Sequence, residues 1–315
     1  MAEHYLKHYI EDELVKPMRA DIYVAERLRL LPRSQLRQRL IALKLNGKEV
    51  KLSKKVKRAD LLEIYWRDPP PLELKPEAME LEIIYEDEDV VVINKEAGLV
   101  VHPGAGQFEH TLVNGLLWHV AGLKTNFPQE ALRPGIVHRL DKDTSGVIIT
   151  AKHPSAVEYL GRQFRLRKVK KLYVALIQGV LPKAAARIET LLVRDRHHRQ
   201  RFRALPVTKT QPLPRGRLAL TDYRVLKHTR EVSLVALKPL TGRTHQLRVH
   251  LKYLGCPILG DRLYGHTSDT PHLFLHAARL ALRLPKDKKR HVFHAPLPVY
   301  FKKMINYYGL GDRAR

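Results

Sequence analysis

The chain has 315 residues, of which 57 are lysine or arginine and 32 are aspartate or glutamate, so its formal net charge is +25. A surplus of this size opposes compaction and favours a polyanionic partner, with nucleic acid ahead of an anionic membrane surface. No apolar run approaches the roughly 20 residues that a spanning helix needs, and the single cysteine, Cys256, excludes an internal disulfide. We therefore expect a cytoplasmic protein with a nucleic-acid partner and no membrane partner.

Residues 1–70 are predicted to form a small basic module that begins with an N-terminal arm of no clear period. Between Glu26 and Arg67, 13 lysines and arginines stand against 4 acidic residues. Ser34 is a predicted helix N-cap, and apolar residues at helical spacing follow it, namely Leu36, Leu40, Ile41 and Leu43. Asn46-Gly47 indicates a hairpin turn, and Leu61–Trp66 is strand-like, so the module is predicted as a helix plus a hairpin.

Prolines at 69, 70 and 71 end this module and predict an extended linker over residues 71–80. The remaining residues, 81–315, are predicted to form one larger domain. Its predicted strands are Leu81–Tyr85, Val90–Asn94, Gly146–Ala151, Leu172–Ile177 and Val232–Leu237, and its predicted helices lie near Thr111–Val120 and Pro154–Arg165. Because strands and helices do not alternate regularly, we predict an α+β fold on a mixed, mainly antiparallel sheet.

Basic residues also cluster within the larger domain, at Arg162–Lys171, Arg194–Arg203 and Lys286–Arg290. A single run of this kind is typical of a solvated face. Three runs together with a basic N-terminal module favour binding of a polyanion.

Three segments place polar residues between apolar ones. In Pro134–Val147, an apolar approach and a returning strand would hold Asp141 on a short supported loop, although the same residues also suit an Asx-type turn without chemistry. In Leu240–Leu251, a helix from Thr244 would project Arg248. In Lys170–Leu176, Tyr173 shares a strand face with Ala175, where a tyrosine is usually a half-buried sheet residue. The spacing alone leaves the chemical and the structural readings open.

The same segments resemble the signature segments of the RluA family of pseudouridine synthases, in the family's order. They are His138-Arg139-Leu140-Asp141, then Lys171-Leu172-Tyr173, then Gly242 to Arg248. Further similarity lies at 92–95, 98–103, 259–265 and 275–277, and Glu96 departs from the family's usual proline. The resemblance covers roughly residues 80–300. The N-terminal module is similar to the S-four-like RNA-binding domain that many members carry.

This resemblance implies a pseudouridine synthase fold and an enzyme that isomerises uridine to pseudouridine in structured RNA. Large-subunit ribosomal RNA is the expected substrate; transfer RNA, or a non-catalytic role in RNA binding or ribosome assembly, is the alternative. Asp141 would be the nucleophile, Arg248 the cation that keeps it ionised through a partly buried ion pair, and Tyr173 a stacking residue and candidate base. The resemblance further implies base flipping, with Arg139 entering the vacated stack. Other expected substrate-binding residues are His138, Thr144, Arg243, His245, Gln246 and Leu275.

Isomerisation requires no redox equivalent or phosphoryl donor, so no cofactor is expected. Clustered histidines (His138, His245 and His250, and His291 and His294) would allow a metal site, but the sequence offers neither the glutamate of a zincin helix nor a cysteine partner. We therefore predict no metal and expect the protein to act as a monomer.

Overall fold

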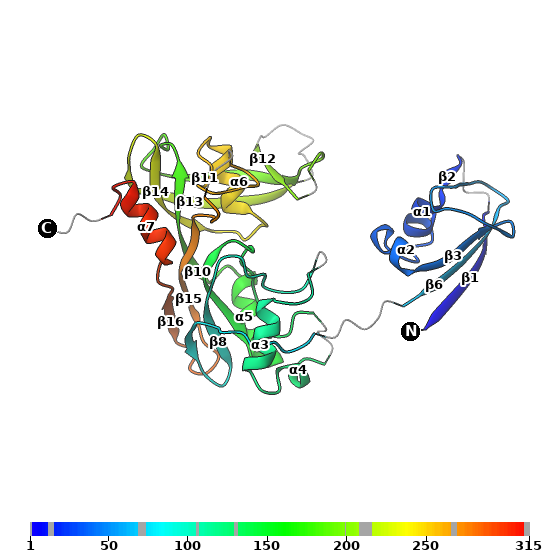
Figure 1. Cartoon of the computed structure of the whole chain (residues 1–315), viewed down its shortest axis with the longest axis horizontal. Helices are drawn as coiled ribbons and strands as arrows, with labels where there is room; N and C mark the ends of the chain where they lie inside the picture. Colours follow the sequence, from blue (N-terminus) through cyan, green and yellow to red (C-terminus); the bar gives the residue numbers. More distant parts are fainter. Residues whose placement is uncertain are drawn as a thin grey trace. The chain divides into compact units, whose positions relative to one another are not determined.

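The structure of the chain is a computed structural model that describes residues 2–11, 16–68, 74–104, 107–128, 132–198, 200–207, 216–265 and 270–311. It divides into two compact units, Met1–Glu73 and Leu74–Arg315 (Figure 1). Of the predicted linker, residues 71–73 lie outside the described residues, whereas the chain from Leu74 onward packs on the larger unit. Leu74 is buried there, and the Asn114 side-chain amide donates a hydrogen bond of 2.8 Å to the carbonyl of Lys75.

The smaller unit is an antiparallel sheet with short helices against one face. The sheet order is β1 (Glu3–Tyr9), β6 (Leu61–Arg67), β3 (Leu40–Leu45) and β4 (Lys48–Glu49), while β2 (Met18–Arg19) pairs with β5 (Lys55–Val56). The helical segments are α1 (Ala20–Ile22), a π-helical turn (Tyr23–Arg27) and α2 (Arg33–Arg39). A separate apolar core, which includes Ile10, Val24 and Ile64, holds these elements together.

Two predictions for this unit are wrong. The helix predicted through Leu43 ends at Arg39, and Leu40–Leu45 is a strand whose buried side chains alternate along its second half. The N-cap is Pro32, without a side-chain hydrogen bond, and Ser34 lies inside the helix.

Two further features of the smaller unit concern a strand and a turn. The segment predicted to lack a period contains β1, which pairs with β6 along its whole length. The Asn46-Gly47 turn is confirmed, because both residues have positive φ, 53° and 79°, between the paired strands β3 and β4.

The larger unit contains a ten-stranded sheet within its described residues. Its order is β12 (Phe202–Pro206), β11 (Ala185–Arg194), β13 (Arg217–His228), β14 (Val232–Pro239), β10 (Lys170–Gln178), β15 (Leu275–Arg283), β9 (Ser145–Ala151), β8 (Val90–Lys95) and β7 (Ile83–Glu86), with β16 (Arg290–His294) beside β15. The helices are α3 (Leu112–His119), α4 (Leu123–Asn126), α5 (Pro154–Arg165), α6 (Gln246–Tyr253) and α7 (Val299–Tyr307). β9 pairs with β15 in parallel, and the other paired strands among the described residues of this sheet are antiparallel. The predicted mixed, mainly antiparallel α+β fold is confirmed.

Local sequence explains the elements that carry the site. Every residue of β9 is buried, as expected for a strand that is covered on both faces. Gly146 has a φ of 114°, and a Cβ atom there would lie 2.4 Å from the carbonyl oxygen of Ala277 on β15. Only glycine therefore allows the parallel contact between the two strands. α5 begins with Pro154 at its first position, behind the N-cap His153.

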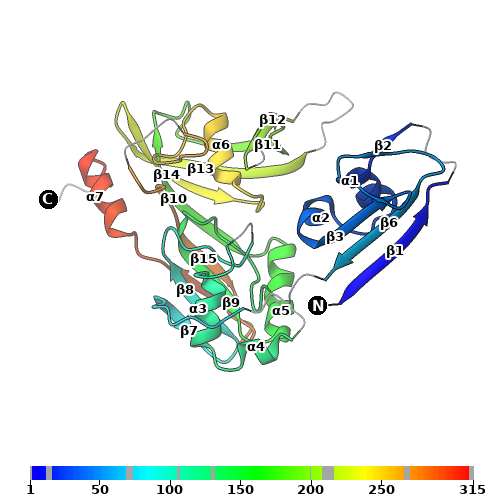
Figure 2. The same cartoon turned by 45° about the vertical axis from the view of Figure 1, so that its right-hand side comes forward.

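Two large apolar cores and one smaller cluster lie in the described part of the larger unit, and Tyr173 on β10 packs against both large cores. Figures 1 and 2 show α3 and α5 beside β8 and β9, and α6 beside β11 and β13. The site described below lies between the part of the unit that contains α3, α5, β8 and β9 and the part that contains α6, β11 and β13. Among the described residues, no helix combines the length and the apolar character needed to cross a membrane.

Candidate active site

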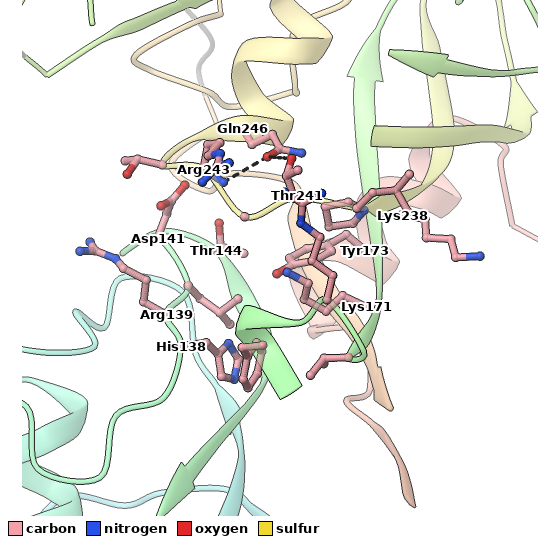
Figure 3. Close-up of a pocket in the computed structure, with 18 of the residues that line it drawn as sticks. His138, Arg139, Asp141, Thr144, Lys171, Tyr173, Lys238, Thr241, Arg243 and Gln246 are labelled. Atoms are coloured by element: carbon pink, nitrogen blue, oxygen red, sulfur yellow. Dashed lines mark hydrogen bonds between the residues drawn. The ribbon is translucent and has the colours of Figure 1, made fainter. Parts of the chain in front are cut away.

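A cavity of about 710 Å³ lies between the loop that precedes β9, the start of β10 and the segment that joins β14 to α6. Figure 3 shows Asp141 and Arg139 on one side of it, and Tyr173 and Lys171 on the other. Asp141 is the only carboxylate among the described lining residues. The lining cations are Arg139, Arg165, Arg167, Lys170, Lys171, Lys238 and Arg243. The cavity therefore suits a polyanion and exposes a single anionic side chain to it.

The loop that carries Asp141 is fixed from several directions. Leu140 is buried, and the N–H of Thr144 donates to the carbonyl of Asp141 at 3.1 Å. The ring Nε2 of His138 accepts a hydrogen bond of 3.1 Å from the backbone N–H of Ile149 on β9. Burial, and then the charge of Lys171, lowers the pKa of His138 to about 3, so the ring is neutral and remains an acceptor. His138 thus lines the cavity, but its Nε2 is engaged in a hydrogen bond that fixes the loop.

A buried lysine holds the other end of this loop. Lys95, at the end of β8, is only 1% exposed, and its ammonium group donates to the carbonyls of Glu96, Leu99 and Lys142 at 2.7, 2.8 and 3.0 Å. Burial lowers the pKa of Lys95 to about 7, although nearby carboxylates, Asp143 first, act in the opposite direction. Lys95 thus connects the turn after Asp141 to the end of β8.

Arg248 lies behind Asp141 and is shared between two carboxylates. Its Nη1 lies 3.9 Å from Asp141 Oδ2, while its Nε and Nη2 each donate to Asp261 at 2.7 Å. The predicted contact between Arg248 and Asp141 is thus present as a longer ion pair, and the close, two-point partner is Asp261. Arg248 is 7% exposed and does not line the cavity. It can therefore influence a bound substrate through its ion pair with Asp141 and not by direct contact.

Asp261 is fully engaged in this arrangement. Its side chain has no exposed area, and its Oδ1 also accepts from the backbone N–H groups of Leu263 and Tyr264 at 3.0 Å. Burial opposes the charge on Arg248, but the hydrogen bonds and charge of Asp261, with a smaller contribution from Asp141, raise the pKa of Arg248 above its ordinary value. The arginine is therefore a permanent cation. In contrast, among the described residues no hydrogen-bond donor binds the side-chain oxygens of Asp141.

Tyr173 projects into the cavity from β10 (Figure 3). Burial, and then the negative charge of Asp141, raises the pKa of Tyr173 above its ordinary value. The side chain is therefore a neutral phenol at neutral pH, which offers a ring face and a hydrogen-bond donor. A role as a base requires prior loss of this proton.

Several residues expected to bind substrate have structural partners. The Gln246 amide donates to Leu220 O and Thr221 Oγ1, and its carbonyl oxygen accepts from Thr241 and from the N–H of Arg243. Gln246 lines the cavity but is fully bonded, and it fixes the segment before α6.

His245 is the N-cap of α6, which begins at Gln246 and not at Thr244 as predicted. Its Nδ1 lies 2.9 Å from the Tyr264 hydroxyl. Burial lowers the pKa of His245. Thr144 and Leu275 are buried lining residues, whereas Arg139 is exposed and its guanidinium points away from Tyr173 (Figure 3).

Sequence reasoning did not assign Asp261, Lys95, Lys171 or Lys238 to the site. Two of them lay within segments noted for their resemblance, 92–95 and 259–265, and an acidic residue in an apolar stretch was the available signal for Asp261. Among the described residues, no group of three histidine, cysteine or acidic side chains is arranged to hold a metal ion.

Comparison with known proteins shows which family the chain resembles. The RNA pseudouridylate synthase family matches residues 89–253. A Borreliella burgdorferi protein named ribosomal large subunit pseudouridine synthase D is 43% identical over 86% of this chain and 83% of its own length. A Vibrio cholerae protein of the same name is 36% identical over 89% of this chain and 88% of its own.

Solved structures show the same fold. Human RNA pseudouridylate synthase domain containing 4 superposes with a TM-score of 0.58 at 28% identity, over 71% of this chain and 92% of that one. Human RNA pseudouridylate synthase domain containing 1 gives a TM-score of 0.55 at 30% identity, over 74% and 87%. With a family match across half of the sequence and relatives of this identity along most of it, the chain belongs to the RluA family of RNA pseudouridine synthases.

Proposed function

We propose that this pseudouridine synthase modifies uridine in ribosomal RNA of the large subunit, with Asp141 as the nucleophile. The observation that carries the role of Asp141 is its isolation: it is the one carboxylate among the described residues of a cationic cavity. The names of the Borreliella and Vibrio relatives support the choice of RNA. We further propose that the protein acts as a monomer in the cytoplasm, since its single cysteine suits a reducing compartment.

The reaction breaks the bond between the ribose anomeric carbon and N1 of uracil and joins that carbon to C5. The proton of C5 is replaced by the new bond and N1 gains one, so substrate and product are isomers. A carboxylate is suited to this exchange because it forms a covalent bond and leaves again, as in retaining glycosidases. In this scheme Asp141 attacks either the anomeric carbon or the base, and the walls of the cavity keep the base from escaping while it turns.

Arg248 has the role of keeping Asp141 ionised. A carboxylate in a closed pocket tends to protonate because burial disfavours its charge, and the guanidinium at 3.9 Å opposes this. Tyr173 would stack on the uracil with its ring. Arg139, exposed on the same loop, would enter the space that the flipped nucleotide leaves.

The unit Met1–Glu73 is proposed to be an S-four-like RNA-binding module. It has its own apolar core and the local excess of basic residues noted above. Its phosphate contacts would offset part of the free energy of base flipping. Removal of residues 1–73 should weaken RNA binding and reduce its salt dependence, while the pseudouridine-forming activity at high RNA concentration persists.

The test of the nucleophile compares Asp141→Asn with Asp143→Asn, which changes an exposed carboxylate two residues further along the same turn. Each protein is incubated with unmodified total RNA, and pseudouridine is mapped by chemical labelling. Wild type and Asp143→Asn should label a uridine of large-subunit RNA, and Asp141→Asn should label none.

Equal labelling by all three proteins would show that Asp141 is not the nucleophile. Labelling confined to transfer RNA would overturn the choice of substrate and leave the chemistry in place.

A further inference from the structure

A second cavity of about 590 Å³ adjoins the catalytic one. It lies against β11, β12 and β13, and the two cavities share the segment Gly242–Thr244 as a common wall. Its volume falls in the range of roughly 300–1,000 Å³ that is typical of small-molecule sites. The described lining residues are Leu192, Val193, Arg194, Phe202, Gly216, Arg217, Gly242, Arg243 and Thr244.

The charge of this second cavity is entirely positive. Arg194, Arg217 and Arg243 line it, and no carboxylate occurs among its described lining residues. Arg243 is held in place, because its Nε donates to the carbonyl of Leu218 at 3.1 Å and its backbone N–H donates to Gln246 at 3.1 Å. Burial, followed by the charges of Arg217 and Arg167, lowers the pKa of Arg243. Mutual repulsion of this kind is relieved when an anion binds among the guanidinium groups.

The cavity also contains flat groups on which a base can stack. The guanidinium carbon of Arg194 lies over the Phe202 ring, 5.7 Å from its centroid. Phe202 is anchored, because its backbone N–H donates to the Tyr264 hydroxyl at 2.9 Å, and it packs against a small apolar cluster that includes Leu192 and Val249. Unpaired bases stack on aromatic rings and on arginine planes. The cavity thus combines an anion site with a rigid stacking surface.

We propose that this second cavity binds a nucleotide next to the target uridine, with its base against Phe202 and Arg194 and its phosphate held by Arg217 and Arg243. The proposal rests on the function proposed above, since it assumes that a uridine occupies the catalytic cavity. A shared wall of three residues allows covalently linked nucleotides to occupy both cavities. The enzyme would therefore select uridines whose neighbour can also leave the RNA stack.

The test uses the full chain and an RNA segment that wild type modifies, with uridine turnover as the readout. Arg217→Gln removes one proposed phosphate contact, and Arg224→Gln changes an exposed arginine of the same strand that does not line the cavity. Arg217→Gln should raise KM about tenfold or more and leave kcat unchanged, because the contact lies outside the catalytic cavity. Arg224→Gln should match wild type.

Modified substrates identify the contact. Single phosphates on either side of the uridine are replaced by neutral methylphosphonates. At one position the replacement should raise the wild-type KM by a similar factor and have no further effect on Arg217→Gln, because both changes remove the same interaction.

Phe202→Leu tests the stacking surface and Phe202→Tyr is its conservative partner. Phe202→Leu should raise KM several-fold, whereas Phe202→Tyr should have the KM of wild type. An RNA whose nucleotide next to the target uridine lacks its base should give the same KM with both variants. Thermal unfolding of each variant shows whether it is folded.

Two results would overturn the proposal separately from the function. One is a KM of Arg217→Gln equal to that of Arg224→Gln, and the other is a set of methylphosphonate penalties that all multiply with the penalty of Arg217→Gln. In either case, turnover by wild type would leave the proposed function standing. A wild type that modifies no RNA would overturn both.

Discussion

The pairing of Arg248 with Asp261 leads to a prediction for the variant Asp261→Asn. The carboxylate accepts two hydrogen bonds from Arg248 at 2.7 Å and two from backbone N–H groups, and its side chain has no exposed area. Asparagine has the same shape but no charge, and one of its two terminal groups is a donor that would face a donor of the arginine or of the backbone. The variant therefore leaves a buried guanidinium with Asp141 as its nearest remaining carboxylate among the described residues.

The size of the effect follows from the burial of the pair. Removal of one partner of a buried ion pair typically destabilises a protein by about 3–5 kcal/mol. In a unit of the size of Leu74–Arg315, each kcal/mol lowers Tm by about 2–4 °C, so a decrease of roughly 6–20 °C is expected. Turnover should also fall, because Arg248 would then move toward Asp141 and occupy the oxygens that attack the substrate in the proposed scheme.

The assay combines differential scanning calorimetry with single-turnover pseudouridine formation. Asp287→Asn is the matched control, since it breaks a carboxylate–histidine contact between side chains about a third exposed (32% and 31%). It should change stability by less than about 1 kcal/mol. The double variant Arg248→Met with Asp261→Asn should recover part of the lost stability, because no unpaired guanidinium stays buried and the asparagine carbonyl oxygen still accepts from the N–H groups of Leu263 and Tyr264. It should not recover activity.

A different outcome would refute this reasoning. If Asp261→Asn were as stable and as active as Asp287→Asn, Asp261 would neither hold Arg248 nor determine its orientation. If the double variant were fully active, Asp141 would not need a cation behind it.

Three further predictions concern the scaffold and the cavity. Gly146→Ala should destabilise by about 3 kcal/mol or more through overpacking and strain, because its Cβ would lie 2.4 Å from Ala277 O; Gly161→Ala in α5, with open space around it, should not lower Tm. Tyr173→Phe should keep the KM of wild type, and Tyr173→Leu should raise KM about tenfold because the stacking ring is lost. Equal KM values for the two variants would exclude stacking by Tyr173. His250 is fully buried, bonded to two threonines, and burial lowers its pKa to about 4. Its contribution to stability should therefore be complete above pH 6.5 and lost toward pH 4, at about 1.4 kcal/mol per pH unit; unfolding titrations of His250→Asn should show a shallower slope.

Sequence patterns predicted best the helices that have a clear start in the sequence. The α5 prediction, Pro154–Arg165, has the observed bounds, and α3 runs from Leu112 to His119 inside the predicted Thr111–Val120. In both cases the first turn has a distinct start signal, a proline at the first position or a capping box. The prediction for Leu40–Leu45 failed because short apolar runs fit both periods. In the structure, hydrogen bonding to β6 makes this segment a strand.

The site could be predicted in part. The loop of Asp141, the strand of Tyr173 and the helix of Arg248 are local features, and the structure brings their residues to one cavity or, for Arg248, directly behind it. The partner of Arg248 could not be found in this way, because Asp261 follows it by 13 residues, after α6 has ended. Such contacts depend on the path of the chain between the elements.

The sharing of Arg248 has a consequence for the proposed chemistry. Coulomb attraction between unit charges about 4 Å apart is roughly 4 kcal/mol at an effective dielectric constant of 20, and the guanidinium of Arg248 lies at this distance from Asp141 without a direct hydrogen bond. A closer, two-point pair would take up the oxygen lone pairs of Asp141 that attack the substrate in this scheme. Asp261 prevents this, because it already accepts the two hydrogen bonds at 2.7 Å. In the proposed scheme, the second carboxylate thus leaves the oxygens of Asp141 available to the substrate.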